Sequence, residues 1–144
     1  MPEELLGTGD ASYAEWAVYT ALTLYACHRQ GNDKPMHQKN ISVGRAAARL
    51  VKSDEDEARI LNRLNLVVTA ISPGDISYYL RSIVQLLSGE AIALDYARLA
   101  KELYLMNYEE TANAVKLRWG RDFYNERYNN TNNDNGKEKE KNNG

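Results

Sequence analysis

The 144-residue chain contains little of the chemistry on which most enzymes depend. It has one cysteine, Cys27, and two histidines, and it contains neither a G-x-x-x-x-G-K-[ST] loop nor a G-x-G-x-x-G loop. One cysteine cannot build a disulfide framework. Cys27 and His28 are adjacent and would point about 100° apart on a helix, so they cannot ligate one metal ion together. We therefore expect a binding protein with no enzymatic activity, no metal site and no cofactor.

Long apolar runs are also missing. No segment approaches the roughly 20 consecutive apolar residues that a membrane span needs. The N-terminal residues MPEELLGTGD lack the basic region and the long apolar segment of a signal peptide. We therefore expect a cytoplasmic protein. Its length and its 43% hydrophobic content are sufficient for one domain with a hydrophobic core.

Apolar residues recur at helical spacing in six segments, and no alternating strand pattern is present. In the first segment Trp16, Tyr19 and Leu24 are expected to be buried, and Ile71 is expected to end the buried stripe of the third. Helix starts are predicted from residues that cap N-termini well. These residues are Ser12, Ser42, Ser53, Ser72 and Asp95. The pattern predicts an all-α fold, a compact bundle of about six helices that spans residues 1–128.

Residues 129–144, NNTNNDNGKEKEKNNG, differ from the rest of the chain. They are rich in asparagine and alternating charge and contain no apolar residue. Such a composition cannot offset the entropy lost when a segment packs. We therefore predict a disordered C-terminal tail.

The strongest functional signal is positive charge between residues 29 and 52. This stretch holds six cationic side chains against one acid, Asp33. If a helix follows Ser42 and continues to Lys52, then Arg45, Arg49 and Lys52 lie within about 60° of one another on one face. A cationic face in an otherwise acidic protein predicts a surface for a phosphate backbone. The alternative is a solvated face whose cations pair with acids elsewhere in the fold.

Further cations stand outside the predicted core stripes of later helices. They include Arg63, Arg81, Arg118 and Arg121. The whole chain nevertheless carries a formal net charge of −2, whereas a free-standing nucleic-acid-binding protein is usually basic throughout. Binding must therefore come from a local patch, which suggests a subunit that is held in place by partners.

Several segments, taken together, are similar to those of a known family. Residues 40–46, NISVGRA, look like a GISLGRAL signature, although position 40 is asparagine where glycine is common. Residues 94–100, residues 118–124 and the helical unit 62–87 are similar to later parts of that family. Over residues 12–125 the chain thus resembles the CasB family, the small subunit of the type I-E CRISPR interference complex called Cascade.

The resemblance implies an all-helical, non-catalytic subunit, present as a homodimer beside the other Cascade subunits. There it would line the duplex of crRNA and target DNA and hold the displaced strand, which stabilises the R-loop. Arg45 matches the signature arginine, and Arg63 and Arg81 match basic positions on the helices that follow. The remaining candidate contacts are assigned from charge and position alone: Arg29, Lys39, Arg49, Lys52, Arg118 and Arg121.

Two other classes of function remain open at this stage. A helical adapter could use the same arginines to dock an acidic protein partner. A small helical hydrolase would need a catalytic carboxylate or histidine, and no recognisable constellation of these residues is present in the sequence.

Overall fold

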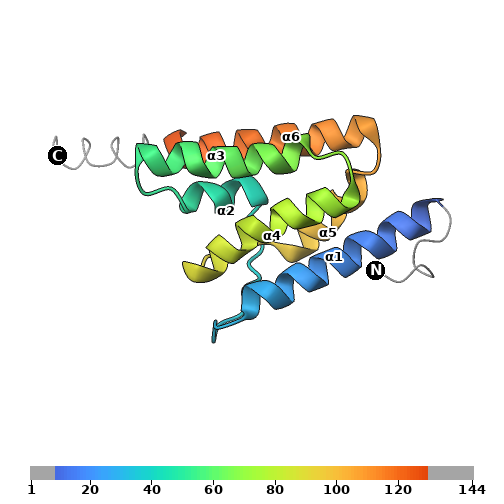
Figure 1. The fold of residues 1–144 in the computed structure, drawn as a ribbon, viewed down its shortest axis with the longest axis horizontal. Helices are drawn as coiled ribbons and strands as arrows, with labels where there is room; N and C mark the ends of the chain where they lie inside the picture. The colour runs from blue at the N-terminus through green and yellow to red at the C-terminus, as the bar shows by residue number, and fades with distance from the viewer. Residues whose placement is uncertain (1–8, 130–144) are drawn as a thin grey trace, which may run out of the picture.

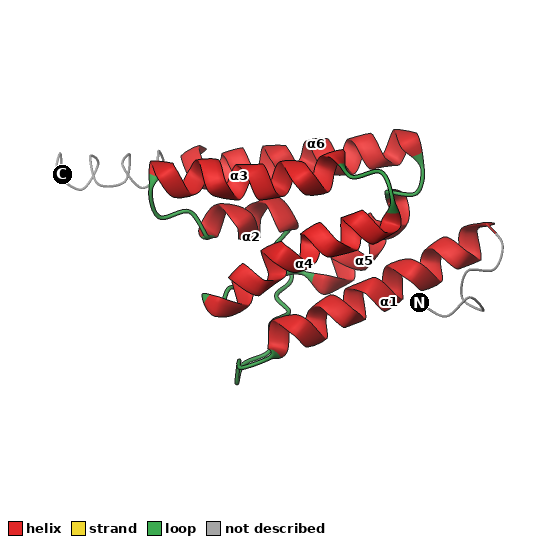
Figure 2. Cartoon of the chain, viewed as in Figure 1, coloured by secondary structure: helices red, strands yellow, loops and turns green. Residues whose placement is uncertain are grey.

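The computed structural model describes residues 9–129 and shows six α-helices followed by a π-helical turn, Asn125–Asn129 (Figures 1 and 2). The helices are α1 (Gly9–Arg29), α2 (Val43–Arg49), α3 (Asp54–Thr69), α4 (Pro73–Gly89), α5 (Tyr96–Leu105) and α6 (Glu109–Tyr124). Residues 9–129 contain no β-strand, only an isolated bridge between His37 and Leu94. The predicted all-α class is confirmed. The predicted tail lies outside the described residues, apart from Asn129, which ends the turn.

Four of the five predicted helix starts are confirmed by hydrogen bonds. The side chains of Ser42, Ser53, Ser72 and Asp95 each accept a backbone N–H from the third residue onward, as N-caps do. The prediction for Ser12 is wrong, because α1 already begins at Gly9 and Ser12 lies inside it. A capping pattern shows that a helix can begin at a residue but does not prevent the preceding residues from extending it.

The helices pack in two groups that share one core. In the first, α1 packs against α4 and α5. In the second, α2 packs against α6 and α3, and α3 and α4 join the two groups (Figure 1). The core runs through both groups without a break, because buried side chains from all six helices belong to one cluster.

The predictions of burial for Tyr19 and Ile71 are wrong, and the one for Trp16 holds only in part. Tyr19 is 45% exposed, because the side of α1 that faces its neighbours carries the small residues Ala17 and Ala21. Trp16 is only partly buried against the core. Ile71 is 95% exposed because α3 ends at Thr69, so the helical spacing that placed this residue inward no longer applies.

The backbones of α2 and α6 approach each other closely. Gly44 is buried in α2, and a Cβ atom placed on it would lie 2.0 Å from the backbone carbonyl oxygen of Trp119. Trp119 is itself fully buried. Only glycine allows the two backbones to approach this closely. The position of α2 against α6 therefore depends on Gly44.

Replacing Gly44 with alanine is expected to destabilise the protein by about 1–3 kcal/mol or more, because the added methyl group meets backbone that cannot rotate away. This cost exceeds the gain of about 1 kcal/mol in helix propensity. Gly120→Ala is the matched control, since a Cβ at that helical position meets nothing within 4 Å. The control should be as stable as the wild type or more stable in urea unfolding. Equal stability of the two variants would show that α2 and α6 can separate freely.

Candidate nucleic-acid interface

The cationic face of α2 is shorter than the sequence predicts. The helix ends at Arg49, with Leu50 as its C-cap, so Lys52 lies in the connection to α3 and not on the helix. Gly44 and the three alanines of α2 are buried on α6 and its other neighbours. Arg45 and Arg49 are one turn apart and are the charged residues of this helix.

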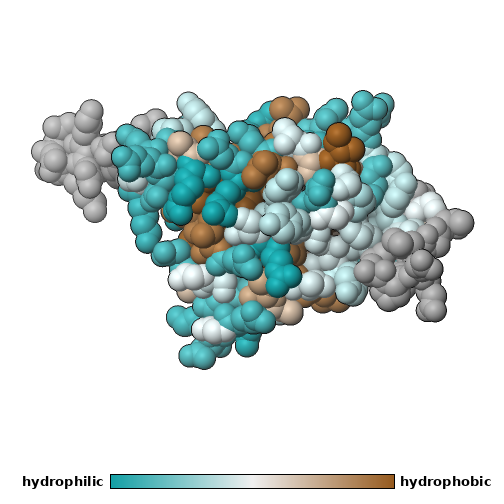
Figure 3. All heavy atoms as spheres, in the orientation of Figure 1, coloured by the Kyte–Doolittle hydropathy of each residue, from teal (hydrophilic) through white to brown (hydrophobic). Residues whose placement is uncertain are grey.

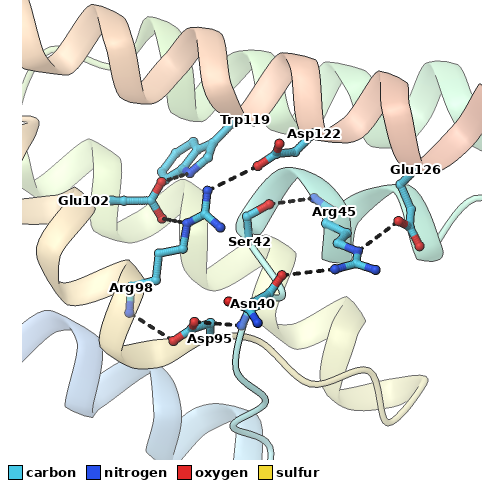
Figure 4. Close-up of polar contacts among 9 residues, drawn as sticks. All are labelled: Asn40, Ser42, Arg45, Asp95, Arg98, Glu102, Trp119, Asp122 and Glu126. Carbon is cyan, nitrogen blue, oxygen red and sulfur yellow. Dashed lines mark hydrogen bonds and ion pairs between the residues drawn. The ribbon is translucent and has the colours of Figure 1, made fainter. Parts of the chain in front are cut away.

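Both arginines are held by one carboxylate, that of Glu126 in the turn after α6, and Figure 4 shows its contact with Arg45. Arg45 Nε lies 2.9 Å from one oxygen of Glu126, and Arg49 Nε lies 3.0 Å from the other. Burial raises the pKa of Glu126, but the hydrogen bonds and charges of the two arginines outweigh it and hold the pKa below its usual range. Two guanidinium groups share one carboxylate, so this cluster keeps a surplus positive charge.

Lys52 has a different partner. Its Nζ lies 3.1 Å from a carboxylate oxygen of Glu90, and both side chains are exposed. All three cations of the predicted stripe are thus paired with acids, as the alternative interpretation of the sequence requires. The structure brings Arg45 and Arg49 together but does not place Lys52 with them.

The other candidate cations lie on separate parts of the fold. Arg63 on α3 donates a hydrogen bond to the hydroxyl oxygen of Ser82 on α4. Within residues 9–129, neither Arg63 nor five further candidates have a carboxylate oxygen within 4.0 Å. They are Arg29 at the end of α1, Lys39 in the following loop, Arg81 on α4, and Arg118 and Arg121 on α6.

The loop before α2 is fixed on the N-terminus of α5. Asn40 adopts a left-handed conformation with φ of 72°, and its N–H donates to Asp95 Oδ2 at 2.9 Å. Its carbonyl oxygen accepts a hydrogen bond from Arg45. His37 Nδ1 accepts the N–H of Tyr96 at 3.0 Å. Asparagine tolerates this conformation better than other non-glycine residues, which explains how position 40 keeps the turn without glycine.

A second arginine network, which sequence reasoning missed, lies beside this loop (Figure 4). Arg98 on α5 contacts Asp122 at 3.4 Å and Glu102 at 3.8 Å. The other oxygen of Glu102 accepts the indole N–H of Trp119 at 2.8 Å. Only the i, i+4 spacing of Arg98 and Glu102 could have indicated part of it.

A pocket of about 320 Å³ separates the two arginine networks. Arg45 and Arg98 line it together with Asp122 and Glu126. Arg118 stands one turn before Asp122 on α6, so a further cation lies next to the same side of the helix. Guanidinium groups bind carboxylates and phosphates with the same planar fork. Arg45 and Arg98 can therefore bind a phosphate in place of their present carboxylate partners.

Among residues 9–129, no three His, Cys, Asp or Glu side chains are placed to hold a metal ion. No helix in that range is long and apolar enough to cross a membrane.

Glu102 makes the free energy of unfolding depend on pH. Its side chain is 3% exposed, and burial raises its pKa from an ordinary 4.5 to about 7, against the lowering effects of Trp119 and Arg98. The folded protein therefore binds this proton more tightly than the unfolded chain does. The contribution of Glu102 to the free energy of unfolding is largest at low pH and falls as the pH rises from 4.5 toward 7.

The variant Glu102→Gln lacks this titration and can still accept the Trp119 N–H. Relative to the wild type, it should gain stability on the order of 3 kcal/mol between pH 4.5 and 7, and the difference should level off above that range. Urea unfolding of both proteins at several pH values measures this difference. His28 and Asp95 also titrate abnormally, but they are common to both proteins and cancel in the comparison. A difference that is constant with pH would contradict the raised pKa.

Comparison with known proteins identifies related chains. A family model described as "CRISPR-associated protein Cse2" matches residues 2–124. The fold is similar to the crystal structure of CasB from Thermobifida fusca, with 39% sequence identity and a TM-score of 0.76. The similarity covers 82% of this chain and 67% of that one. No curated protein matches the chain.

Proposed function

Since this chain belongs to the Cse2 (CasB) family of CRISPR-associated proteins, we propose that it binds nucleic acid within a type I-E Cascade complex. Family membership makes it a small subunit of Cascade, associated with the other subunits of that complex, and it confirms the resemblance seen in the sequence. The proposed role is non-catalytic. Phosphate contacts from this subunit hold the displaced DNA strand beside the duplex of crRNA and target, and so stabilise the R-loop.

The energetics of R-loop formation favour this kind of contribution. One duplex is exchanged for another of similar stability, so a few protein contacts to the DNA backbone can shift the balance. Guide pairing reads the sequence, and the protein therefore needs phosphate contacts but no element that reads bases. Arginines on helix surfaces meet this requirement.

The arginine pair on α2 is the observation that carries the proposal. Arg45 and Arg49 already bind one anionic group, the carboxylate of Glu126, with both Nε atoms at 2.9–3.0 Å. Their combined charge exceeds that of their partner. A phosphate that replaces or joins this carboxylate would meet two guanidinium groups in a suitable arrangement. Arg81, Arg118 and Arg121, which have no ion pair within residues 9–129, lie on other helices and would meet other phosphates of the same strand.

A helical adapter that docks an acidic protein remains the second candidate. The same observation favours it, because Arg45 and Arg49 demonstrably hold a carboxylate. The two functions differ in what the surface recognises, a chain of phosphates or an acidic protein segment. The salt dependence of DNA binding separates them.

The direct test removes both charges of the arginine pair in the double variant Arg45→Gln/Arg49→Gln. Replacement by glutamate is unsuitable, since it would place new carboxylates against Glu126. Binding of target DNA by reconstituted Cascade should weaken equally for unrelated matched sequences, because phosphate contacts carry no base information. The slope of log affinity against log salt should fall by roughly 0.7 for each lost single-strand contact.

A matched control removes two charges elsewhere. Lys101 and Lys116 lie on α5 and α6 outside this arginine cluster, so Lys101→Gln/Lys116→Gln should leave the slope unchanged. Assembly of each complex is checked by size-exclusion chromatography. Unchanged affinity and slope in an assembled arginine variant would reject phosphate binding at α2. Failed assembly with intact folding would favour the adapter.

Glu126→Gln tests the same surface by removing the negative charge that pairs with the two arginines. The variant keeps a hydrogen-bonding side chain of the same size but frees one more positive charge on Arg45 and Arg49. Complexes with this variant should bind target DNA more tightly, with a salt slope steeper by up to about 0.7 per added contact. Filter binding at several salt concentrations provides the measurement. Weaker or equal binding would mean that the two arginines serve only to join α2 to the turn after α6.

A further inference from the structure

A hollow of about 420 Å³ lies between α3 and α4, apart from the arginine pair on α2. One wall is formed by Arg59, Asn62, Arg63 and Leu66, which share a face of α3 at helical spacing. The other wall consists of Tyr78, Tyr79 and Ser82 of α4. We call this site the α3–α4 groove. On the face drawn in Figure 3, apolar patches lie among hydrophilic side chains over these two helices.

The charge of the α3–α4 groove favours an anionic ligand. Two guanidinium groups line it, and no aspartate or glutamate does. Arg63 is oriented by its hydrogen bond to Ser82 across the groove. Arg59 is tethered at 3.2 Å to Asp56, which lies one turn earlier on α3 and outside the lining. Both arginines are thus held at the groove and keep further N–H donors for a ligand.

The opposite wall presents an aromatic ring to solvent. Tyr78 is 71% exposed, and Leu66 across the groove is 46% exposed. The Tyr78 ring is supported by an edge contact with Tyr79, with centroids 5.5 Å apart and planes at 73°. An edge contact leaves ring faces available for another planar group. Exposed apolar side chains gathered beside charged ones are typical of binding sites.

We propose that the α3–α4 groove binds one unpaired nucleobase of a single strand, stacked on Tyr78, with a flanking phosphate held by Arg59 and Arg63. Asn62 is exposed at the same groove and supplies an amide for the edge of the base. Arg81 stands one turn beyond Tyr78 on α4 and continues the positive charge along the strand. Stacking of this kind tolerates any base, as a displaced strand of arbitrary sequence requires.

This inference rests on the proposed function, because the R-loop supplies the unpaired strand. It adds base stacking to a surface otherwise proposed to contact only phosphates. The two contributions respond differently to salt. Loss of stacking lowers the affinity at every salt concentration, whereas loss of a phosphate contact also lowers the slope.

The test compares Tyr78→Ala and Tyr78→Phe in reconstituted Cascade on a target whose displaced strand contains bromodeoxyuridine. Tyr78→Ala should weaken binding by about fivefold to a hundredfold with an unchanged salt slope. Tyr78→Phe keeps the ring and should bind like the wild type. Arg59→Gln should lower the slope by about 0.7. Ultraviolet crosslinking should join the displaced strand to the segment that contains Tyr78, and the alanine variant should lose this crosslink.

Tyr19→Ala is the control, since Tyr19 is also an exposed tyrosine but lies on α1, away from the groove. It should leave affinity and crosslinking unchanged. Wild-type affinity in Tyr78→Ala, with crosslinks elsewhere, would overturn the base site and leave the proposed function standing. Loss of assembly in Tyr78→Ala would show that a neighbouring protein subunit occupies the groove. The remaining outcome is that Cascade binds target DNA equally well with and without this subunit at every salt concentration. That result would overturn both the proposed function and the base site.

Discussion

The contact between Gly44 and the backbone of Trp119 sets how α2 lies on α6, and the arginine pair on α2 depends on it. A helix of seven residues such as α2 is too short to be stable alone, so its conformation depends on the surfaces against which it packs. The missing side chain at Gly44 allows α2 to lie directly on the backbone of α6. From this position Arg45 and Arg49 reach the carboxylate of Glu126 just beyond the end of α6.

Trp119 also belongs to a largely buried polar network with Glu102 and Arg98. Trp119 is buried and directs its indole N–H to Glu102, which has almost no exposure to water. The carboxylate of Glu102 lies near Arg98, and Arg98 in turn reaches Asp122 on α6. A buried carboxyl group is costly unless hydrogen bonds and opposite charges compensate for its lost hydration. Trp119 and Arg98 compensate Glu102 only in part, so its pKa stays raised, at about 7.

Within the proposed function, the acidic partners of the arginines have a consequence for affinity. A phosphate at α2 must compete with Glu126, so binding exchanges one anion for another and gains less than binding at an unpaired arginine would. The isolated subunit, with a net charge of −2, should therefore hold DNA weakly. Inside a complex the strand is already nearby, and weak contacts from several cations suffice to shift a nearly balanced exchange. The arginine pair and the α3–α4 groove would then act on one strand through phosphate contact and stacking, neither of which selects a sequence.

The sequence by itself determined the helices and most of their boundaries. Caps and helical spacing depend on residues three or four positions apart, and the caps at Ser42, Ser53, Ser72 and Asp95 were readable for that reason. It also showed that α2 carries cations on one face, and its segments indicated the family. Only the tertiary structure decided whether those cations have partners. Arg45 and Glu126 are separated by 81 positions, and no local pattern connects residues so far apart. The requirement for glycine at position 44 and the groove beside Tyr78 likewise come from how separate helices meet, which no periodicity within one helix records.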